Sequence, residues 1–385
     1  MRKLRNIALA LLMACAGSCI DPPLHLPGDD VLVDVPVVLT DMEVVWNTDI
    51  SWQNEWFYGW DTVDSDLWGP IEYPKPTNYE VRRYYLGNKP GVKHTEVDPF
   101  TIFGTRFRRY YNFGYYDMLI WSNIDSSEGS QVVVIDETDI DEVRATTTGN
   151  KGMLNMVPAS VAPNAVAGIY NQPEIFYSTY PQNIYISRFF EDYDYYDEVE
   201  QVWVKQIETE LTPLVYIYLV QVVLYDNDGR IVGTTGSNSM SGLASSTNVN
   251  TGHTGDNPGM VYYETRYKKG LPVKGKTADV MGGKLTTFGL CDMDRGLKTK
   301  AGSQYTGTKT DVKNVVYFDL TFVNGAVKTF SYDVTSQMQA KAHGGVITIE
   351  LNARDIEIPD PHHEAGSLFV PSVDDYDEVV WDFDV

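Results

Sequence analysis

Apolar and polar residues alternate along much of this chain with the period of two that is typical of half-buried β-strands. In the first half, apolar runs of this kind are interrupted by turn segments such as Gly-Asn-Lys-Pro-Gly at 87–91. The segment 139–143 is too short to predict a helix. We predict strands in the first half at 31–39, 79–86, 100–116, 118–121 and 132–135.

The second half has the same pattern with clearer turns. The run 214–225 ends at Asp-Asn-Asp-Gly and resumes at 231–233, and Asn324-Gly325 separates two further runs, so both places predict hairpins. One short helix is predicted after Thr335, closed by the glycines at 344 and 345. The predicted strands of this half are 202–207, 214–225, 231–233, 284–289, 315–323, 326–332, 346–351 and 378–385.

These elements predict an all-β chain with at most one or two short helices, arranged as two β-sandwiches in tandem. The 26 tyrosines and eight tryptophans suit half-buried pleated surfaces. A length of 385 residues also favours two domains. We place the domains at 31–200 and 201–385, because the acidic run 191–200 is typical of a solvated segment that closes the first half.

The first 30 residues follow a different pattern. Arg2, Lys3 and Arg5 precede a short apolar run at 7–14 and then Ala-Gly-Ser, which is the layout of a secretory signal peptide and too short for a membrane span. The cysteine that follows, Cys19, resembles the lipidated cysteine of the bacterial lipoprotein lipobox. This resemblance implies that 1–18 is removed and that 19–30 is a proline-containing lipidated tether. Cys15 is a competing site, and secretion without a lipid is the alternative.

Charge and cysteine content narrow the function classes. A net charge of −23 opposes binding to nucleic acid and to anionic headgroups. After the signal segment, no apolar run approaches the ~20 residues of a membrane-spanning helix, so membrane attachment depends on the lipid. Only Cys291 remains besides the leader and anchor cysteines, so the body has no internal disulfide.

No group of residues has the spacing of a catalytic or metal site. His362 and His363 are neighbours, which point to opposite faces in a strand. The Asp-Asn-Asp-Gly segment at 226–229 resembles a calcium loop, but Ser237 stands where the loop needs a glutamate. Nucleophile elbows and phosphate-binding glycine loops are absent from the sequence. We therefore predict that the protein is not an enzyme and holds no metal or cofactor.

Large aromatic residues concentrate between residues 46 and 68. Trp52, Trp56 and Trp60, mixed with acidic and amide side chains, could form a flat platform for a glycan. The interpretation that we favour is that these rings are buried in a core or in a seam between domains. The basic and aromatic segments 82–85 and 106–111 are expected to pair with nearby acids.

Several short segments of the second half resemble, in their order and spacing, the C-terminal domain of the fimbrillin-type lipoproteins of Bacteroidales, a family that includes fimbria anchor and accessory subunits. The resemblance covers most of 202–385 and, more loosely, the first half. The segments are 211–218, 226–233, 240–246, 332–338, 344–350 and 356–360.

The resemblance implies two transthyretin-like (Greek-key) sandwiches, export as an outer-membrane lipoprotein, and association with other fimbrial subunits by β-strand addition. Polymerising members are cleaved after an arginine near their first strand. No such arginine can be singled out here, which suits an anchor, accessory or minor subunit that keeps its lipid.

The last segment, 378–385, is the candidate partner strand, because Trp381, Phe383 and Val385 alternate with acids. It can equally be the last strand of its own sandwich. We expect a lipid-anchored structural protein of a fimbria-like assembly at the cell surface. The alternative is a surface lipoprotein that binds glycans through the Trp-rich region.

Overall fold

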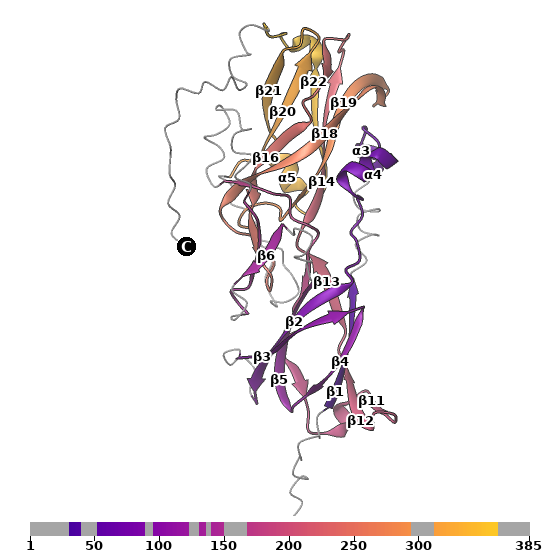
Figure 1. The fold of residues 1–385 in the computed structure, drawn as a ribbon, viewed down its shortest axis with the longest axis vertical. Coiled ribbons are helices and arrows are strands. Elements are labelled where there is room, and N and C mark those ends of the chain that lie inside the picture. The colour runs from indigo at the N-terminus through magenta and orange to yellow at the C-terminus, as the bar shows by residue number, and fades with distance from the viewer. Residues whose placement is uncertain are drawn as a thin grey trace, which may run out of the picture.

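The computed structural model describes residues 31–39, 52–88, 95–122, 131–135, 140–149, 168–293 and 312–360. The predictions for 1–30 and 378–385, including Cys19, Trp381, Phe383 and Val385, lie outside these residues. The described chain is mainly β, with two large sheets and one small one, which confirms the predicted fold class. The two large sheets follow one another along the long axis of the molecule (Figure 1).

The first large sheet has β1 (Val31–Leu39) among its central strands. β1 pairs in parallel with β12 (Val202–Gln206) and β13 (Thr209–Pro213), and antiparallel with β4 (Arg106–Tyr111). The order is β11-β12-β1-β13-β9-β5-β2-β3, with β10 beside β5. The remaining strands are β2 (Asn78–Gly87), β3 (Thr95–Phe103), β5 (Gly114–Ser122), β9 (Tyr177–Thr179), β10 (Ile184–Ile186) and β11 (Tyr195–Asp197).

β1 is bound within this sheet by a buried apolar core and by ion pairs. Val33 and Val35 are fully buried in a core with residues of β2 and β5. The buried carboxylate of Asp34 lies 3.2 Å from Arg106 Nε and 3.7 Å from Arg108 Nε. The segment 106–111 therefore pairs with nearby acids, as predicted.

The second large sheet folds into two layers that share the long strand β18 (Pro258–Val273). One layer contains β16 (Ser237–Ala244) and the other contains β14 (Tyr216–Tyr225), and their inner side chains form one core. The order is β15-β20-β16-β18-β19-β14-β22, with β21 beside β20 and β8 beside β18. The remaining strands are β8 (Ile169–Tyr170), β15 (Ile231–Gly233), β19 (Lys276–Thr287), β20 (Val315–Phe322), β21 (Val327–Asp333) and β22 (Gly345–Asn352).

One of the two predicted hairpins is wrong. The turn at 226–229 exists, but β14 pairs with β19 and β22, whereas β15 pairs with β20. The turn therefore carries the chain from one layer to the other, and Asn227 fixes it through hydrogen bonds with both the N–H and the C=O of Ile231. The Asn324-Gly325 hairpin between β20 and β21 is confirmed, as is the helix α5 (Thr335–Ala340).

A small sheet lies between the two large ones. It consists of β6 (Val132–Ile135), β7 (Arg144–Thr147) and β17 (Ser246–Asn248). A buried cluster at this level joins Trp121 and Phe176 of the first half to Leu214 and Phe288 of the second. The domain boundary at residue 200 stays a prediction, and pairing within the first sheet runs on to Pro213.

Two short helices, α3 (Trp52–Glu55) and α4 (Thr62–Trp68), were not expected from the sequence. They belong to residues 52–73, which we call the clasp and which lies beside β14 in the upper half of Figure 1. No helix within the described ranges is long and apolar enough to cross a membrane.

The clasp covers the outer face of the second sheet. Trp56 and Tyr58 pack against Leu219 and Val223 of β14 and against neighbouring residues of β19 and β22. Val220 and Val222 of β14 point instead into the sandwich core. β14 is therefore buried on both faces.

Replacing Gly282 by alanine tests the contact between the clasp and β19. A Cβ at Gly282 would lie 2.7 Å from Tyr58 Cγ and 2.8 Å from Trp56 Cη2. We expect Gly282→Ala to lower the free energy of unfolding in chemical denaturation by about 1–3 kcal/mol, as overpacking of a core does. Gly233→Ala is the matched control, because no heavy atom lies within 4 Å of its Cβ position. Equal losses in the two variants would contradict the prediction.

Candidate functional site

The structure separates the three tryptophans of the candidate glycan platform by exposure. Trp56 is 3 % exposed, and its indole N–H donates to the Gly59 carbonyl at 2.6 Å. Trp52 and Trp60 are half-buried. Trp60 and Trp68 pack at a tilt, with ring centroids 5.5 Å apart, so the two rings are not coplanar. Trp56 belongs to the buried core under the clasp, and Trp52 and Trp60 pack against that core.

A buried glutamine attaches the clasp to the middle of β14. The side-chain oxygen of Gln221 accepts from the backbone N–H groups of Phe57 (2.9 Å) and Tyr58 (3.3 Å). Its amide nitrogen donates to the Glu55 carbonyl (2.6 Å) and to Thr348 Oγ1 (3.0 Å). The buried amide side chain of β14 thus binds the backbone of the clasp instead of water.

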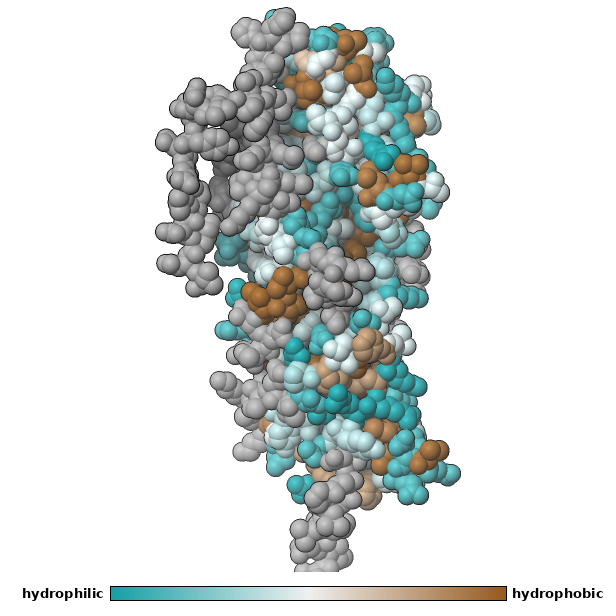
Figure 2. All heavy atoms as spheres, viewed as in Figure 1, coloured by the Kyte–Doolittle hydropathy of each residue, from teal (hydrophilic) through white to brown (hydrophobic). Residues whose placement is uncertain are grey.

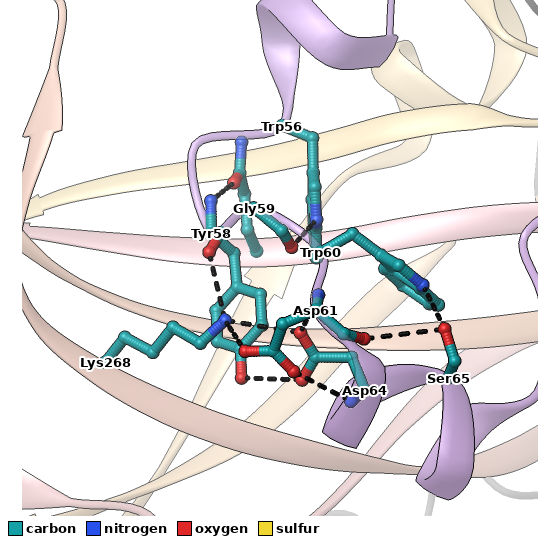
Figure 3. A network of polar contacts seen from close by, with 9 residues as sticks. Trp56, Tyr58, Gly59, Trp60, Asp61, Asp64, Ser65 and Lys268 are labelled. Atoms are coloured by element: carbon teal, nitrogen blue, oxygen red, sulfur yellow. Dashed lines mark hydrogen bonds and ion pairs between the residues drawn. The ribbon is translucent and has the colours of Figure 1, made fainter.

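A charged network binds the middle of the clasp, residues 58–64, to β18 (Figure 3). Lys268 Nζ of β18 lies 3.1 Å from a carboxylate oxygen of Asp61 and 3.2 Å from one of Asp64. The same ammonium stands 4.0 Å from the centre of the Tyr58 ring, and the Tyr58 hydroxyl donates to Asp64. This arrangement of one cation, two anions and an aromatic face is suited to holding a segment in place.

The titration of this network follows from its contacts. Burial, and then the adjacent Asp64 carboxylate, raises the pKa of Tyr58 well above its ordinary value, so the phenol stays protonated. The hydrogen bond from the Asp64 backbone N–H lowers the pKa of Asp61. Neutral pH therefore leaves Tyr58 as a donor and Asp61 as an anion facing Lys268.

We did not predict the start of α4 from the sequence, although the sequence carries a signal for it. Asp61 accepts from the Asp64 backbone N–H, and the Asp64 side chain accepts from the Asp61 N–H, each at 3.0 Å. This is a capping box in which aspartate replaces the usual glutamate at the third helical position. The sequence signal for this helix start is the pair of aspartates three positions apart, Asp61 and Asp64.

Lys284 of β19 is held under the far end of the clasp. Its Nζ donates to the carbonyls of Trp68 (2.9 Å) and Pro70 (2.5 Å). Burial lowers the pKa of Lys284 to about 8. Below about pH 8 the Lys284 side chain is therefore a cation, and the two carbonyl oxygens compensate its charge.

The outer edge of β22 is occupied by side chains from α5 and the turn after it. The Gln337 side chain donates to the Thr348 C=O and accepts from the Thr348 N–H, both at 2.9 Å, as a neighbouring strand would. Lys341 Nζ donates to the Val346 carbonyl at 2.6 Å and also pairs with Glu55 of the clasp. These contacts protect the edge from pairing with another chain.

We find no metal site among the described residues. They contain no group of three or more histidine, cysteine, aspartate or glutamate side chains that could hold an ion. Residues His362 and His363 lie outside the described residues. Cys291 is buried and is not in a disulfide.

A pH titration of stability tests the burial of Lys284. From pH 8 to pH 10.5, the unfolded chain keeps a proton on this lysine that the folded chain has released, so its contribution to the free energy of unfolding rises with pH. We expect the difference between wild type and Lys284→Met to increase by about 1 kcal/mol from pH 7.5 to pH 9.

Taking this difference cancels the contribution of tyrosines such as Tyr58, whose raised pKa lowers stability above pH 10. Both proteins are unfolded with urea at each pH. A difference that is flat or that falls over this range would show that burial does not lower the pKa of Lys284.

The fold can be compared with known proteins. No family model matches the sequence, and no curated protein matches it. A structure from Bacteroides ovatus, described as a putative adhesin, matches with a TM-score of 0.51 and 13 % identity, over 86 % of this chain and 94 % of that one.

Two further structures are similar over most of their length. A protein of the same description from Bacteroides thetaiotaomicron has a TM-score of 0.45 and 9 % identity, over 84 % of this chain and 93 % of that one. The fimbrial anchor protein Mfa2 from Porphyromonas gingivalis has a TM-score of 0.40 and 13 % identity, over 83 % and 90 %. The first similarity, with a TM-score above 0.5, shows that this chain has the fold of the Bacteroides ovatus protein. This fold agrees with the resemblance to fimbrillin-type lipoproteins of Bacteroidales.

Proposed function

We propose that this chain is a lipid-anchored, non-enzymatic structural protein of a fimbria-like assembly at the cell surface, acting as an anchor, accessory or minor subunit. Cys19 carries the lipid, and 378–385 pairs with a partner subunit by strand addition. The shared fold and the order of the sequence motifs support this proposal.

The observation that carries the proposal is the way in which β1 is built into its sheet. Three strands pair with β1, and Val33 and Val35 are fully buried. No lysine or arginine occurs between Arg5 and Lys75, and the next arginine, Arg82, lies within β2. Cleavage after a lysine or arginine therefore cannot fall between β1 and the clasp, which supports a subunit in which the first strand stays joined to the clasp.

The occupied edges support the donation of a strand over the acceptance of one. β1 fills the first sheet, and Gln337 and Lys341 bind the outer edge of β22. A chain with these positions filled is better suited to donate a strand than to accept one. The alternation of Trp381, Phe383 and Val385 fits the donated strand.

Deleting 378–385 tests this role. We expect loss of co-purification with fimbrial partners and an unchanged thermal transition of the body by circular dichroism, because the donated strand lies outside its core. Asp382→Asn/Asp384→Asn is the matched control, which keeps the apolar face and retains the partner. An unfolded deletion variant would mean that the segment belongs to its own sandwich.

Intact mass of the protein isolated from its native membrane tests the anchor. The expected result is an acylated Cys19 followed by an uncleaved body, since no lysine or arginine follows Arg5 before Lys75. A new N-terminus after an internal arginine, with the lipid lost, would instead indicate a polymerising pilin. An unmodified Cys19 thiol would remove the tether.

A further inference from the structure

The two ends of the described chain lie at opposite poles of the molecule. β1 lies at the lower end of Figure 1, and β22 runs toward the upper end, where the turn η5 (Ala353–Asp355) follows it. In the proposed function, a mechanical force acts on these two ends, because the tether precedes β1 and the partner strand follows η5. We call this force the load. The path of that load through the sheets can be traced from the strand pairing.

In the lower sheet, one path for the load crosses between two parallel neighbours, beside the path from β1 through the clasp. The tether pulls on the start of β1, and β13 leads within two residues into β14 of the upper sheet. β1 and β13 are paired in parallel, with Val37 opposite Thr209 and Leu39 opposite Leu211. Forces on the start of one strand and the end of its parallel neighbour slide the two strands past each other.

The upper sheet repeats this arrangement. β14 receives the load at its start, and β22 passes it on at its end. The two strands are parallel neighbours over eight paired positions, from Tyr218 opposite Gly345 to Tyr225 opposite Asn352. Sliding β22 along β14 therefore loads the whole ladder at once instead of opening it pair by pair.

We propose that the β1/β13 and β14/β22 pairs are two load-bearing shear clamps, and that the chain transmits tension between its membrane tether and its partner through both sheets. This function rests on the proposed anchoring for its biological setting. Its physical basis, the parallel pairing of the strands that receive and pass on the load, is a property of the chain alone.

Side chains reinforce the lower clamp. The same strand β1 also pairs in parallel with β12 and antiparallel with β4 over six positions, from Val31 opposite Tyr111 to Pro36 opposite Arg106. The Asp34 carboxylate binds Arg106 and Arg108 across this ladder, and the Asp34 carbonyl accepts from the Ile207 N–H at 3.0 Å. Shearing β1 must break these contacts together.

Single-molecule force spectroscopy on the full mature chain tests the proposal, with the lipid replaced by a handle at residue 30 and a second handle at residue 360. We expect rupture of the whole body to lengthen the chain by at most roughly 115 nm in total, because 31–352 comprises about 320 residues and an extended residue spans at most ~3.6 Å.

A change of pulling direction is the first control. With handles at residues 30 and 112, the start of β1 is pulled away from the end of β4, so the same strand is peeled off one pair at a time. The rupture force should then fall at least about twofold, because fewer hydrogen bonds share the load. Equal forces in the two directions would overturn the proposal.

A pair of matched variants separates mechanical from thermodynamic effects. Val33 on β1 and Val81 on β2 are both fully buried in the same core. Val33→Ala and Val81→Ala should lower the melting temperature similarly, but only Val33→Ala should lower the force at which the body first ruptures. A similar loss of force in both variants would contradict the clamp. Since neither lipid nor partner is present, a negative result would leave the anchoring proposal standing.

Discussion

A strand buried on both faces is the constraint on which the rest of this structure depends. β14 lies in the interior of its sheet, and its side chains point alternately into the sandwich core and onto the outer face. Antiparallel sandwiches commonly leave the outer face to solvent, so apolar residues such as Leu219 and Val223 need a cover. The clasp supplies it, and Gln221 binds the clasp backbone at the point where an unpaired amide would be costly.

This constraint explains the concentration of aromatic residues near the N-terminus. A segment of 22 residues with two short helices can cover a sheet only if its side chains are large and flat, and Trp56 and Tyr58 meet this need above Gly282. The charges of the region serve the same contact, since Lys268 joins Asp61 and Asp64 to β18. The acidic and aromatic composition that resembles a sugar platform is therefore explained, in large part, by attachment to the sheet.

Local features of the fold were predictable from the sequence and long-range pairing was not. Asn324-Gly325 forms a hairpin because that dipeptide fixes the backbone of the turn itself. The turn at 226–229 has a similar signal, yet its strands lie in different layers, because pairing of β14 is decided by β19 and β22, far along the chain. The same holds for the clasp: the Trp-rich composition predicted burial, but only the structure identifies the sheet that buries it.

The order of β1 and the clasp along the chain ties the two halves together. β1 is fixed in the lower sheet, and the clasp, which is separated from the end of β1 by 12 residues, is fixed on the upper one. The connection from β13 to β14 is a second covalent link between the same two sheets. The cluster of Trp121, Phe176, Leu214 and Phe288 fills the space between these links. These covalent crossings and the packed seam restrict bending between the halves, and such stiffness suits a body that must keep its two ends apart under load.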